Sequence, residues 1–156
     1  MRNDTGQFPL VGTCRCGRTE FEVSAQPLVT CACHCRGCQH MSSSAYSLTA
    51  IFAAESFRVR KGEPVKGGLQ GPQLDHYFCS FCKTWMFTRV TGMDEIVNVR
   101  PTLLDDPRWS EPFIETMTSA KLPWVQIPAR HSFAEFPSLE DLQGLMDDFA
   151  HQIQKE

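Results

Sequence analysis

Four of the eight cysteines in the chain fall within eight residues, from Cys31 to Cys38. Thiolate sulfur is a preferred ligand of zinc, and C-x-C and C-x-x-C spacings let one turn aim several sulfurs at one point. Cys33, Cys35 and Cys38 have this spacing. Three protein ligands leave a fourth position for water or substrate, which is the pattern of a catalytic rather than a structural zinc. We therefore expect a zinc site with an open position here.

The other cysteines form two close pairs, Cys14 with Cys16 and Cys79 with Cys82. Two such pairs far apart in sequence are typical of a closed four-sulfur zinc site that joins two hairpins. A disulfide framework is the alternative, but a chain of 156 residues can bury a core without one. The cysteine count thus predicts two zinc ions per chain, with Cys31 left over.

Composition excludes several classes of partner. Apolar residues make up 42% and charged residues 21% of the chain, as in ordinary globular proteins. The net charge is −3 and no Lys/Arg run occurs, so neither nucleic acid nor a membrane is an expected partner. No apolar stretch approaches the ~20 residues of a spanning helix, and the N-terminus lacks the apolar segment of a secretory signal. We expect a cytoplasmic protein and make no prediction of its oligomeric state.

Two hairpins are expected to present the outer cysteine pairs. Gly17, directly after Cys16, suits the positive φ of a tight turn at the first tip. The second tip contains Cys79 and Cys82. The flanking strands are expected over residues 8–14 and 19–23 for the first hairpin, and over 74–78 and 85–90 for the second.

The remaining pattern predicts a single, mainly β domain over residues 1–156, with antiparallel sheets and a core over about 8–130. Ser138 is a suitable N-cap for a C-terminal helix over about 138–152, whose apolar face is Leu142, Leu145, Met146 and Phe149. Residues 36–43 predict a short helix or turn, and turn residues occupy 61–64 and 66–68. Further extended segments are expected over 44–52, 57–59, 96–99 and 112–118.

These motifs resemble the glutathione-dependent formaldehyde-activating enzyme family, which has the β-rich Mss4-like fold with zinc knuckles at hairpin tips. The matches occur in the family's order and span about residues 10–125. They comprise residues 12–17, 21–23, 33–38, 78–82 with Thr84, and 103–107.

The resemblance implies a structural zinc on Cys14, Cys16, Cys79 and Cys82, and a second zinc whose open position takes a thiol. The implied thiol is glutathione, and the implied reaction joins it to formaldehyde as S-hydroxymethylglutathione, a carbon–sulfur lyase reaction in reverse. The chemistry is reasonable, because metal charge favours a thiolate and a thiolate held beside an aldehyde carbonyl adds to it.

Two residues depart from the family pattern. Lys83 stands where the family usually has glycine, so we expect the second knuckle to turn differently. Cys31 shares a strand face with Cys33. A small buried thiol is the favoured interpretation of Cys31; as a fourth ligand it would close the inner site, and a redox role is the third alternative.

Glutathione carries two carboxylates, so an arginine or lysine clamp is expected. Arg36, inside the cysteine cluster, is the preferred substrate-binding candidate, together with Gln39 and His40. His34 points away from the ligands on an extended segment, so a supporting or a surface role is expected rather than metal binding. The other candidate cations are Arg58, Arg60, Arg100 and Arg130.

The leading hypothesis is a zinc-dependent carbon–sulfur lyase-like enzyme that acts on a thiol–aldehyde adduct. A zinc-stabilised binding module without catalysis, or a thiol redox switch, is the alternative on the same fold.

Overall fold

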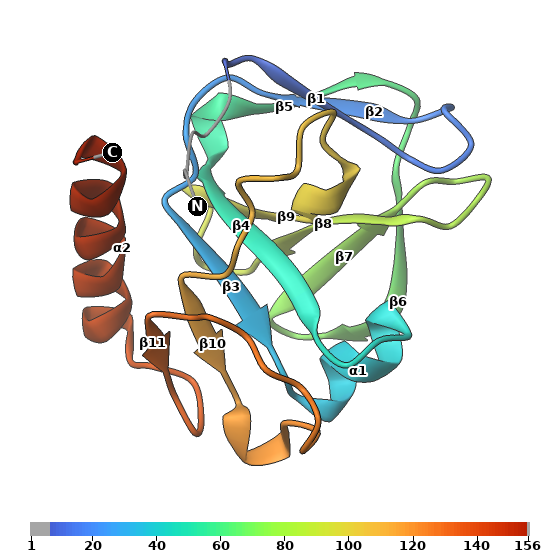
Figure 1. Ribbon diagram of the computed structural model, residues 1–156. Coiled ribbons are helices and arrows are strands. Elements are labelled where there is room, and N and C mark those ends of the chain that lie inside the picture. Colours follow the sequence, from blue (N-terminus) through green and yellow to red (C-terminus); the bar gives the residue numbers. More distant parts are fainter. Residues whose placement is uncertain (1–6, 156) are drawn as a thin grey trace.

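The computed structural model describes residues 7–155, which form two β-sheets and two α-helices (Figure 1). The elements in chain order are β1 (Leu10–Thr13), β2 (Glu20–Val23), β3 (Val29–Cys33), α1 (Arg36–Ser42), β4 (Ser47–Ala53), η1 (Ala54–Ser56), β5 (Phe57–Lys61), β6 (Val65–Gly71), β7 (Leu74–Phe78), β8 (Trp85–Val90), β9 (Ile96–Val99), η2 (Pro101–Leu103), β10 (Ile114–Thr116), η3 (Thr118–Ala120), β11 (His131–Ser132) and α2 (Leu139–Gln154).

The strands form a small sheet that packs on a large one. The small sheet has the order β1-β2-β5, and the large sheet has the order β11-β10-β3-β4-β9-β8-β7-β6. Most pairs are antiparallel, as the sequence predicts, and the mainly β fold is confirmed. The exceptions are β10 with β3 and β10 with β11, which are parallel. The sequence analysis did not foresee this parallel edge, which connects distant segments of the chain.

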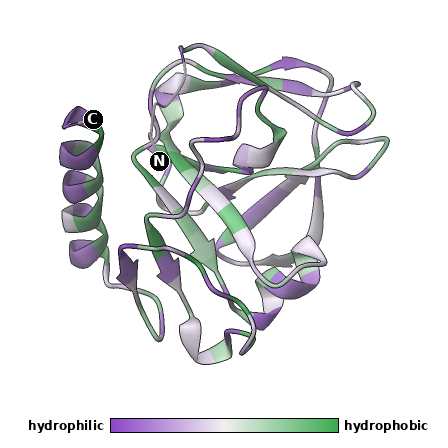
Figure 2. Cartoon of the chain, viewed as in Figure 1, coloured by the Kyte–Doolittle hydropathy of each residue, from purple (hydrophilic) through white to green (hydrophobic). Residues whose placement is uncertain are grey.

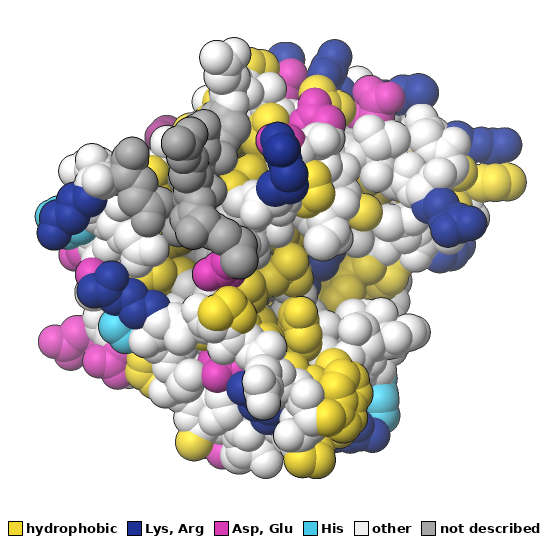
Figure 3. Space-filling view, in the orientation of Figure 1, with side chains coloured by type: hydrophobic (Ala, Val, Ile, Leu, Met, Phe, Trp, Pro, Cys, Tyr) yellow, Lys and Arg dark blue, Asp and Glu magenta, His cyan; other side chains and the backbone are white. Residues whose placement is uncertain are grey.

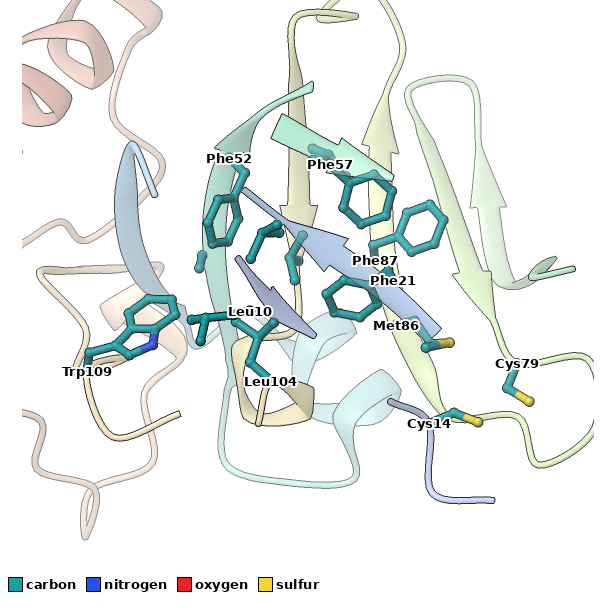
Figure 4. Packing of buried hydrophobic residues seen from close by; sticks show 14 residues of the cluster. Leu10, Cys14, Phe21, Phe52, Phe57, Cys79, Met86, Phe87, Leu104 and Trp109 are labelled. Carbon is teal, nitrogen blue, oxygen red and sulfur yellow. The ribbon is translucent and has the colours of Figure 1, made fainter. Parts of the chain in front are cut away.

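The main core lies between the two sheets and is rich in phenylalanine (Figure 4). The Phe57 ring lies 5.5 Å from the Phe21 ring and 4.8 Å from the Phe87 ring, between centroids. Aromatic side chains bury a large apolar area, so such a cluster contributes strongly to stability. Gly12 faces Phe21 across the β1–β2 pair, and a Cβ at Gly12 would overlap the Phe21 ring. The Phe21 ring can therefore lie across the neighbouring strand only because position 12 is glycine.

Side chains along the central strands of the large sheet point alternately to its two faces, one of which packs on the core. Ala50 and Phe52 of β4 point into the core, whereas Thr49 and Ile51 line a cavity on the opposite face. Successive side chains of a strand point to opposite faces, so one strand serves both regions. The sheet thus carries a dry core on one face and a cavity on the other.

The predicted hairpins and C-terminal helix are confirmed. Strands β7 and β8 have the predicted bounds, and β1 and β2 lie within theirs. In α2 the Ser138 hydroxyl accepts a hydrogen bond from the Asp141 backbone N–H at 3.1 Å, which caps the helix. Leu145 and Phe149 are buried against Val29 and Phe113, so α2 covers a second, smaller core (Figure 1).

The prediction of a turn over residues 66–68 was wrong, because this segment belongs to strand β6 at the edge of the large sheet. Gly67 lets the Phe78 ring of the neighbouring strand approach, since a Cβ there would lie 2.9 Å from that ring. Gly68 has a φ of 65° and lies at an irregularity in the β6–β7 register. Glycine here marks a bulged edge strand rather than a loop.

Hydrophobic residues are frequent along β3 and β4, whereas the visible surface of α2 is largely hydrophilic (Figure 2). On the face seen in Figure 3, Lys and Arg side chains are scattered among Asp and Glu rather than gathered in one basic patch. Within residues 7–155, no helix is long and apolar enough to cross a membrane.

Candidate metal centres and the adjoining cavity

The outer cysteine cluster unites the tips of the two predicted hairpins. The sulfurs of Cys14, Cys16, Cys79 and Cys82 all lie within 4.8 Å of one another. The Cys14–Cys16 sulfur distance is 3.5 Å and the Cys16–Cys79 distance is 3.8 Å. A tetrahedral zinc with sulfurs at ~2.3 Å separates its ligands by about 3.8 Å, so the donor set fits this ion. The four sulfurs have the number and spacing of a closed, four-ligand metal site.

Contacts between the two hairpin tips hold this cluster together. The Thr84 hydroxyl accepts a hydrogen bond from the Arg15 backbone N–H at 3.2 Å and lies 3.1 Å from the Cys82 sulfur, to which it can donate. Donation from Thr84 lowers the pKa of the Cys82 thiol to about 5. The Arg18 guanidinium lies 3.5 Å from the centroid of the Phe81 ring, a cation–π contact across the tips. The polypeptide therefore preorganises the outer site from both sides.

The second knuckle has the same left-handed turn as the first, although Lys83 stands at the position that Gly17 occupies in the first knuckle. Lys83 has a φ of 60°, close to the 78° of Gly17 at the matching position of the first knuckle. The expectation that Lys83 turns the knuckle differently was therefore wrong. The Lys83 ammonium donates to the Ser80 carbonyl at 2.6 Å, and its backbone N–H donates to the Cys79 carbonyl at 3.1 Å. These bonds offset the left-handed backbone of a non-glycine residue.

The inner cluster lies at the junction of β3 and α1. Cys33 ends β3, Cys35 is the N-cap of α1, and Cys38 lies in its first turn. The three sulfurs are within 4.8 Å of one another. The Cys35 sulfur accepts a hydrogen bond from the Cys38 backbone N–H at 3.2 Å, so the helix cap itself positions one sulfur. Three thiolates suit zinc and leave one tetrahedral position free.

The pKa values of two of these thiols shift in opposite directions. A hydrogen bond from Cys38 lowers the pKa of Cys33, while the pKa of Cys38 is raised by its bond to Cys33. Thiolates are the form that binds metal, so the polypeptide favours metal binding here.

Cys31 shares the strand face of Cys33, as expected, but it does not join the inner cluster. Its sulfur lies 3.9 Å from the Thr116 hydroxyl oxygen. Desolvation raises the pKa of the Cys31 thiol to about 12, so it remains protonated. Within the described part of the chain, the inner cluster consists of three cysteines and Cys31 stands beside it in the cavity wall.

His34 lies behind the cluster, so of the supporting and surface roles that the sequence left open, the structure favours the supporting one. Its side chain is fully buried, and its Nε2 lies 2.9 Å from a carboxylate oxygen of Glu115 on β10. Lys121 and Ser132 also donate to that carboxylate. The His34 backbone N–H donates to the Thr116 carbonyl at 3.0 Å. The parallel β3–β10 pairing therefore anchors the segment between Cys33 and Cys35.

The three sequence candidates for substrate binding contact one another and the backbone. Gln39 is buried, and its amide donates to the His34 carbonyl at 2.8 Å and the Ala120 carbonyl at 3.1 Å. Arg36 donates to the Gln39 side-chain oxygen and lies 3.2 Å from His40 Nε2. None of Arg36, Gln39 and His40 is among the described residues that line the cavity. Their substrate-binding role stays a prediction.

A cavity of about 260 Å³ opens directly beside the inner cluster. Cys33 and Cys38 form one end of it, and its walls come from β4, β7, β8, β9 and β10 on the sheet face opposite the core. Phe136, Pro137 and Leu142 close it on the side of α2. A concave, largely apolar site with a few convergent polar groups is the usual form of a small-molecule site.

Arg100 is the cation that faces this cavity. It directly follows β9, is 9% exposed, and its guanidinium carbon lies 4.1 Å from the centroid of the Trp85 ring. Its Nε is buried without a hydrogen-bond partner among the described residues. Burial lowers the pKa of Arg100 to about 10, and the nearby Cys38, Cys31 and Cys33 oppose this shift, so Arg100 is charged at neutral pH.

The other candidate arginines have surface partners. Arg58 and Arg60 bond Glu22 at 2.9 and 3.6 Å, and Arg130 bonds Asp148 at 3.7 Å. Arg100 was one of the candidate cations in the sequence analysis. The sequence could not distinguish it from the others, because the cavity that it lines is assembled from strands far apart in the chain. Its one local signal is position: it is a cation placed directly after an apolar strand.

The sequence analysis did not single out His76 and Trp85, which line the cavity. His76 Nδ1 lies 2.9 Å from the Thr88 hydroxyl, and the Trp85 indole N–H donates to the same hydroxyl at 3.3 Å. Both rings also line the cavity. The sequence of β7 alternates polar and apolar residues, and this pattern is the same whether the polar side faces a cavity or solvent. The sequence therefore could not predict that this side faces a cavity.

Comparison with known proteins agrees with this architecture. The model of the glutathione-dependent formaldehyde-activating enzyme family matches residues 9–120, which is most of the chain and includes all eight cysteines. A crystal structure of a Rhodobacter sphaeroides protein aligns with a TM-score of 0.52 and 24% identity, covering 63% of this chain and 92% of that one. That likeness shows a shared fold. A search of curated proteins found no significant match.

The chain belongs to the glutathione-dependent formaldehyde-activating enzyme family. Its two cysteine clusters have the donor chemistry and spacing of metal sites.

Proposed function

We propose that the protein is a zinc-dependent carbon–sulfur lyase-like enzyme that forms and breaks a thiol–aldehyde adduct, S-hydroxymethylglutathione in the case of glutathione and formaldehyde. The family supports glutathione and formaldehyde as reactants. The observation that carries the proposal is the three-sulfur cluster open to a cavity. A purely structural site would need no such opening.

In this proposal Cys33, Cys35 and Cys38 hold a catalytic zinc, and Cys14, Cys16, Cys79 and Cys82 hold a structural one. A zinc ion in the inner site would supply positive charge that favours the thiolate form of an incoming thiol and polarises a carbonyl oxygen. The residues themselves bind and orient the reactants. Apolar walls restrict water around the reacting sulfur, and positioning the sulfur beside the carbonyl carbon lowers the entropic barrier.

The reaction is an addition without oxidation or reduction. The thiol S–H bond breaks, a sulfur–carbon bond forms to the aldehyde carbon, and the carbonyl π bond opens. The thiol proton ends on the former carbonyl oxygen, which becomes the hydroxyl of the adduct. The reverse reaction releases thiol and aldehyde.

The test measures exchange between glutathione and its adduct with ¹³C-formaldehyde by NMR, with and without zinc-loaded protein. We expect the protein to accelerate exchange above the uncatalysed rate, and Cys38→Ser to abolish the acceleration together with one of two zinc ions per chain. Cys31→Ser is the matched control for metal content, because Cys31 lines the same cavity but stands outside the cluster. A fully zinc-loaded protein that neither binds a thiol nor changes the exchange rate would contradict the proposal.

A further inference from the structure

Among the described residues that line the cavity beside the inner cluster, Arg100 is the one side chain of fixed charge, and there is no aspartate, glutamate or lysine. We propose that this cavity recognises the thiol substrate through a single carboxylate, bound by Arg100 and His76, and makes no use of an ammonium group on the substrate. The inference rests on the proposed function and adds the chemical class of the thiol.

The state of Arg100 is the first argument. A buried guanidinium without hydrogen-bond acceptors costs several kcal/mol unless a partner compensates it. Within residues 7–155 Arg100 has a cation–π contact with Trp85, its Nε is buried without a hydrogen-bond partner, and its side chain borders the cavity. A planar guanidinium presents donors that match a carboxylate. The missing acceptor is therefore supplied by a ligand carboxylate in the cavity.

The placement of His76 is the second argument. Its Nδ1 lies 2.9 Å from the Thr88 hydroxyl, which also accepts a hydrogen bond from the Trp85 indole N–H at 3.3 Å. These contacts hold the imidazole ring in the cavity wall beside Trp85. Desolvation lowers the pKa of His76, and Arg100 lowers it further. A neutral imidazole carries one N–H, so with that hydrogen on Nε2 the ring offers a donor without adding a second charge.

The lack of acidic residues is the third argument. A substrate ammonium would need a carboxylate partner to be bound tightly out of water. An adjoining hollow of about 430 Å³ shares Ser47, Trp85 and Arg100 with the cavity, and the residues that line it include no aspartate or glutamate either. For glutathione, one carboxylate would reach Arg100, and the ammonium-bearing end would lie outside. A short thiol with one carboxylate satisfies the whole site.

The experiment compares two thiols of the same length, 3-mercaptopropionate and 3-mercaptopropionamide, by titration calorimetry of the zinc-loaded protein. We expect wild type to bind the carboxylate roughly 10- to 100-fold more tightly than the amide, as a charge-assisted bond would give. Arg100→Met should abolish this preference, and Arg100→Lys should retain part of it with the metal content unchanged. Arg58→Met, which alters a surface ion pair, is the matched control and should keep the preference.

A thiol-free pair, butyrate and butyramide, separates this inference from the proposed function. We expect butyrate, but not butyramide, to shift the indole N–H resonance of Trp85 in wild type, identified with Trp85→Phe. If butyrate binds and neither thiol does, the carboxylate site stands and the proposed function fails. If wild type binds both thiols equally, or if Arg100→Met keeps the preference, the inference is overturned while thiol binding still supports the proposed function.

Discussion

The two cysteine clusters use the same donor atom in opposite settings. The outer cluster has four sulfurs at the tips of two hairpins, with Cys14 and Cys79 buried at one end of the phenylalanine core (Figure 4). The inner cluster has three sulfurs where a strand meets a helix, and it faces a cavity on the other side of the sheet. Four ligands complete a tetrahedral site, whereas three leave it reactive.

In the proposed assignment, ligand number and surroundings, rather than ligand type, separate a structural from a reactive site. The outer site lies between chain segments more than sixty residues apart, so a metal there would hold the two sheets together. The inner site spans six residues, so a metal there would constrain little of the fold. Losing each metal should therefore have very different consequences.

The largest effect is expected for Cys79→Ser in the outer site. A structural zinc contributes on the order of 10 kcal/mol to a fold that contains it, so loss of a ligand should lower the free energy of unfolding by more than about 3 kcal/mol. Metal analysis and denaturant unfolding measure both quantities. Retention of two metals and of the wild-type unfolding midpoint would refute the structural assignment.

Cys38→Ser in the inner site should separate function from stability. We expect one zinc per chain instead of two and loss of thiol binding, with a change in unfolding free energy below about 1.5 kcal/mol. Metal analysis, titration with 3-mercaptopropionate and denaturant unfolding measure these quantities on one sample. Unfolding as severe as in Cys79→Ser would remove the contrast between the two sites.

Glu115→Gln tests the polar support behind the inner site. Gln carries no charge to pair with Lys121 and has one acceptor oxygen where Glu115 uses two, so we expect a loss of about 1–3 kcal/mol at pH 7. Although burial opposes it, the bonds from Lys121, Ser132 and His34 keep the pKa of Glu115 below its ordinary value of 4.5.

A depressed carboxylate pKa gives stability that is complete above about pH 4.5 and disappears as the pH falls through the folded-state pKa. The difference between wild type and Glu115→Gln should therefore shrink below pH 4.5. Urea unfolding from pH 7 to pH 3.5 follows this difference. A gap that stays constant over that range would show that the Glu115 charge contributes nothing.

Cys31→Ala should leave both metals in place. Cys31 stands outside the three-sulfur cluster, and replacing a small thiol by a methyl group removes little packing, so a loss of about 1 kcal/mol or less is expected. Metal analysis with Cys33→Ala as the matched comparison decides the point. Loss of the inner zinc in Cys31→Ala would make the site a closed four-sulfur centre and favour a non-catalytic binding module.

The smallest effect is expected at the two knuckle turns. Lys83→Gly relieves a positive φ, so we expect stabilisation of roughly 0.5 kcal/mol, partly offset by the greater entropy of the unfolded chain. Gly17→Ala at the matching position should destabilise by about 1 kcal/mol. Thermal unfolding of both variants gives the signs, and equal signs would contradict the shared geometry of the knuckles.

The sequence by itself determined both cysteine clusters, the hairpins that present the outer one, the capped C-terminal helix and the family. All of these depend on residue type at short spacing: C-x-C and C-x-x-C pairs fix sulfurs on one turn, and alternation or a Ser138 cap fixes local backbone. Arg36, Gln39 and His40 were chosen by the same short-range reasoning, because they are adjacent to the cysteines in the chain.

Only the tertiary structure decided which residues surround the open site. The cavity beside the inner cysteines is lined by Arg100, His76 and Trp85, because β7, β8 and β9 lie in one sheet with β3 and β4. The parallel strand β10 brings Glu115 behind His34. Such neighbours result from strand order and register, which depend on long-range packing and leave no short spacing in the sequence. Ligands that are close in the sequence can be predicted from their spacing, whereas the residues that line a cavity are known only once the sheet is assembled.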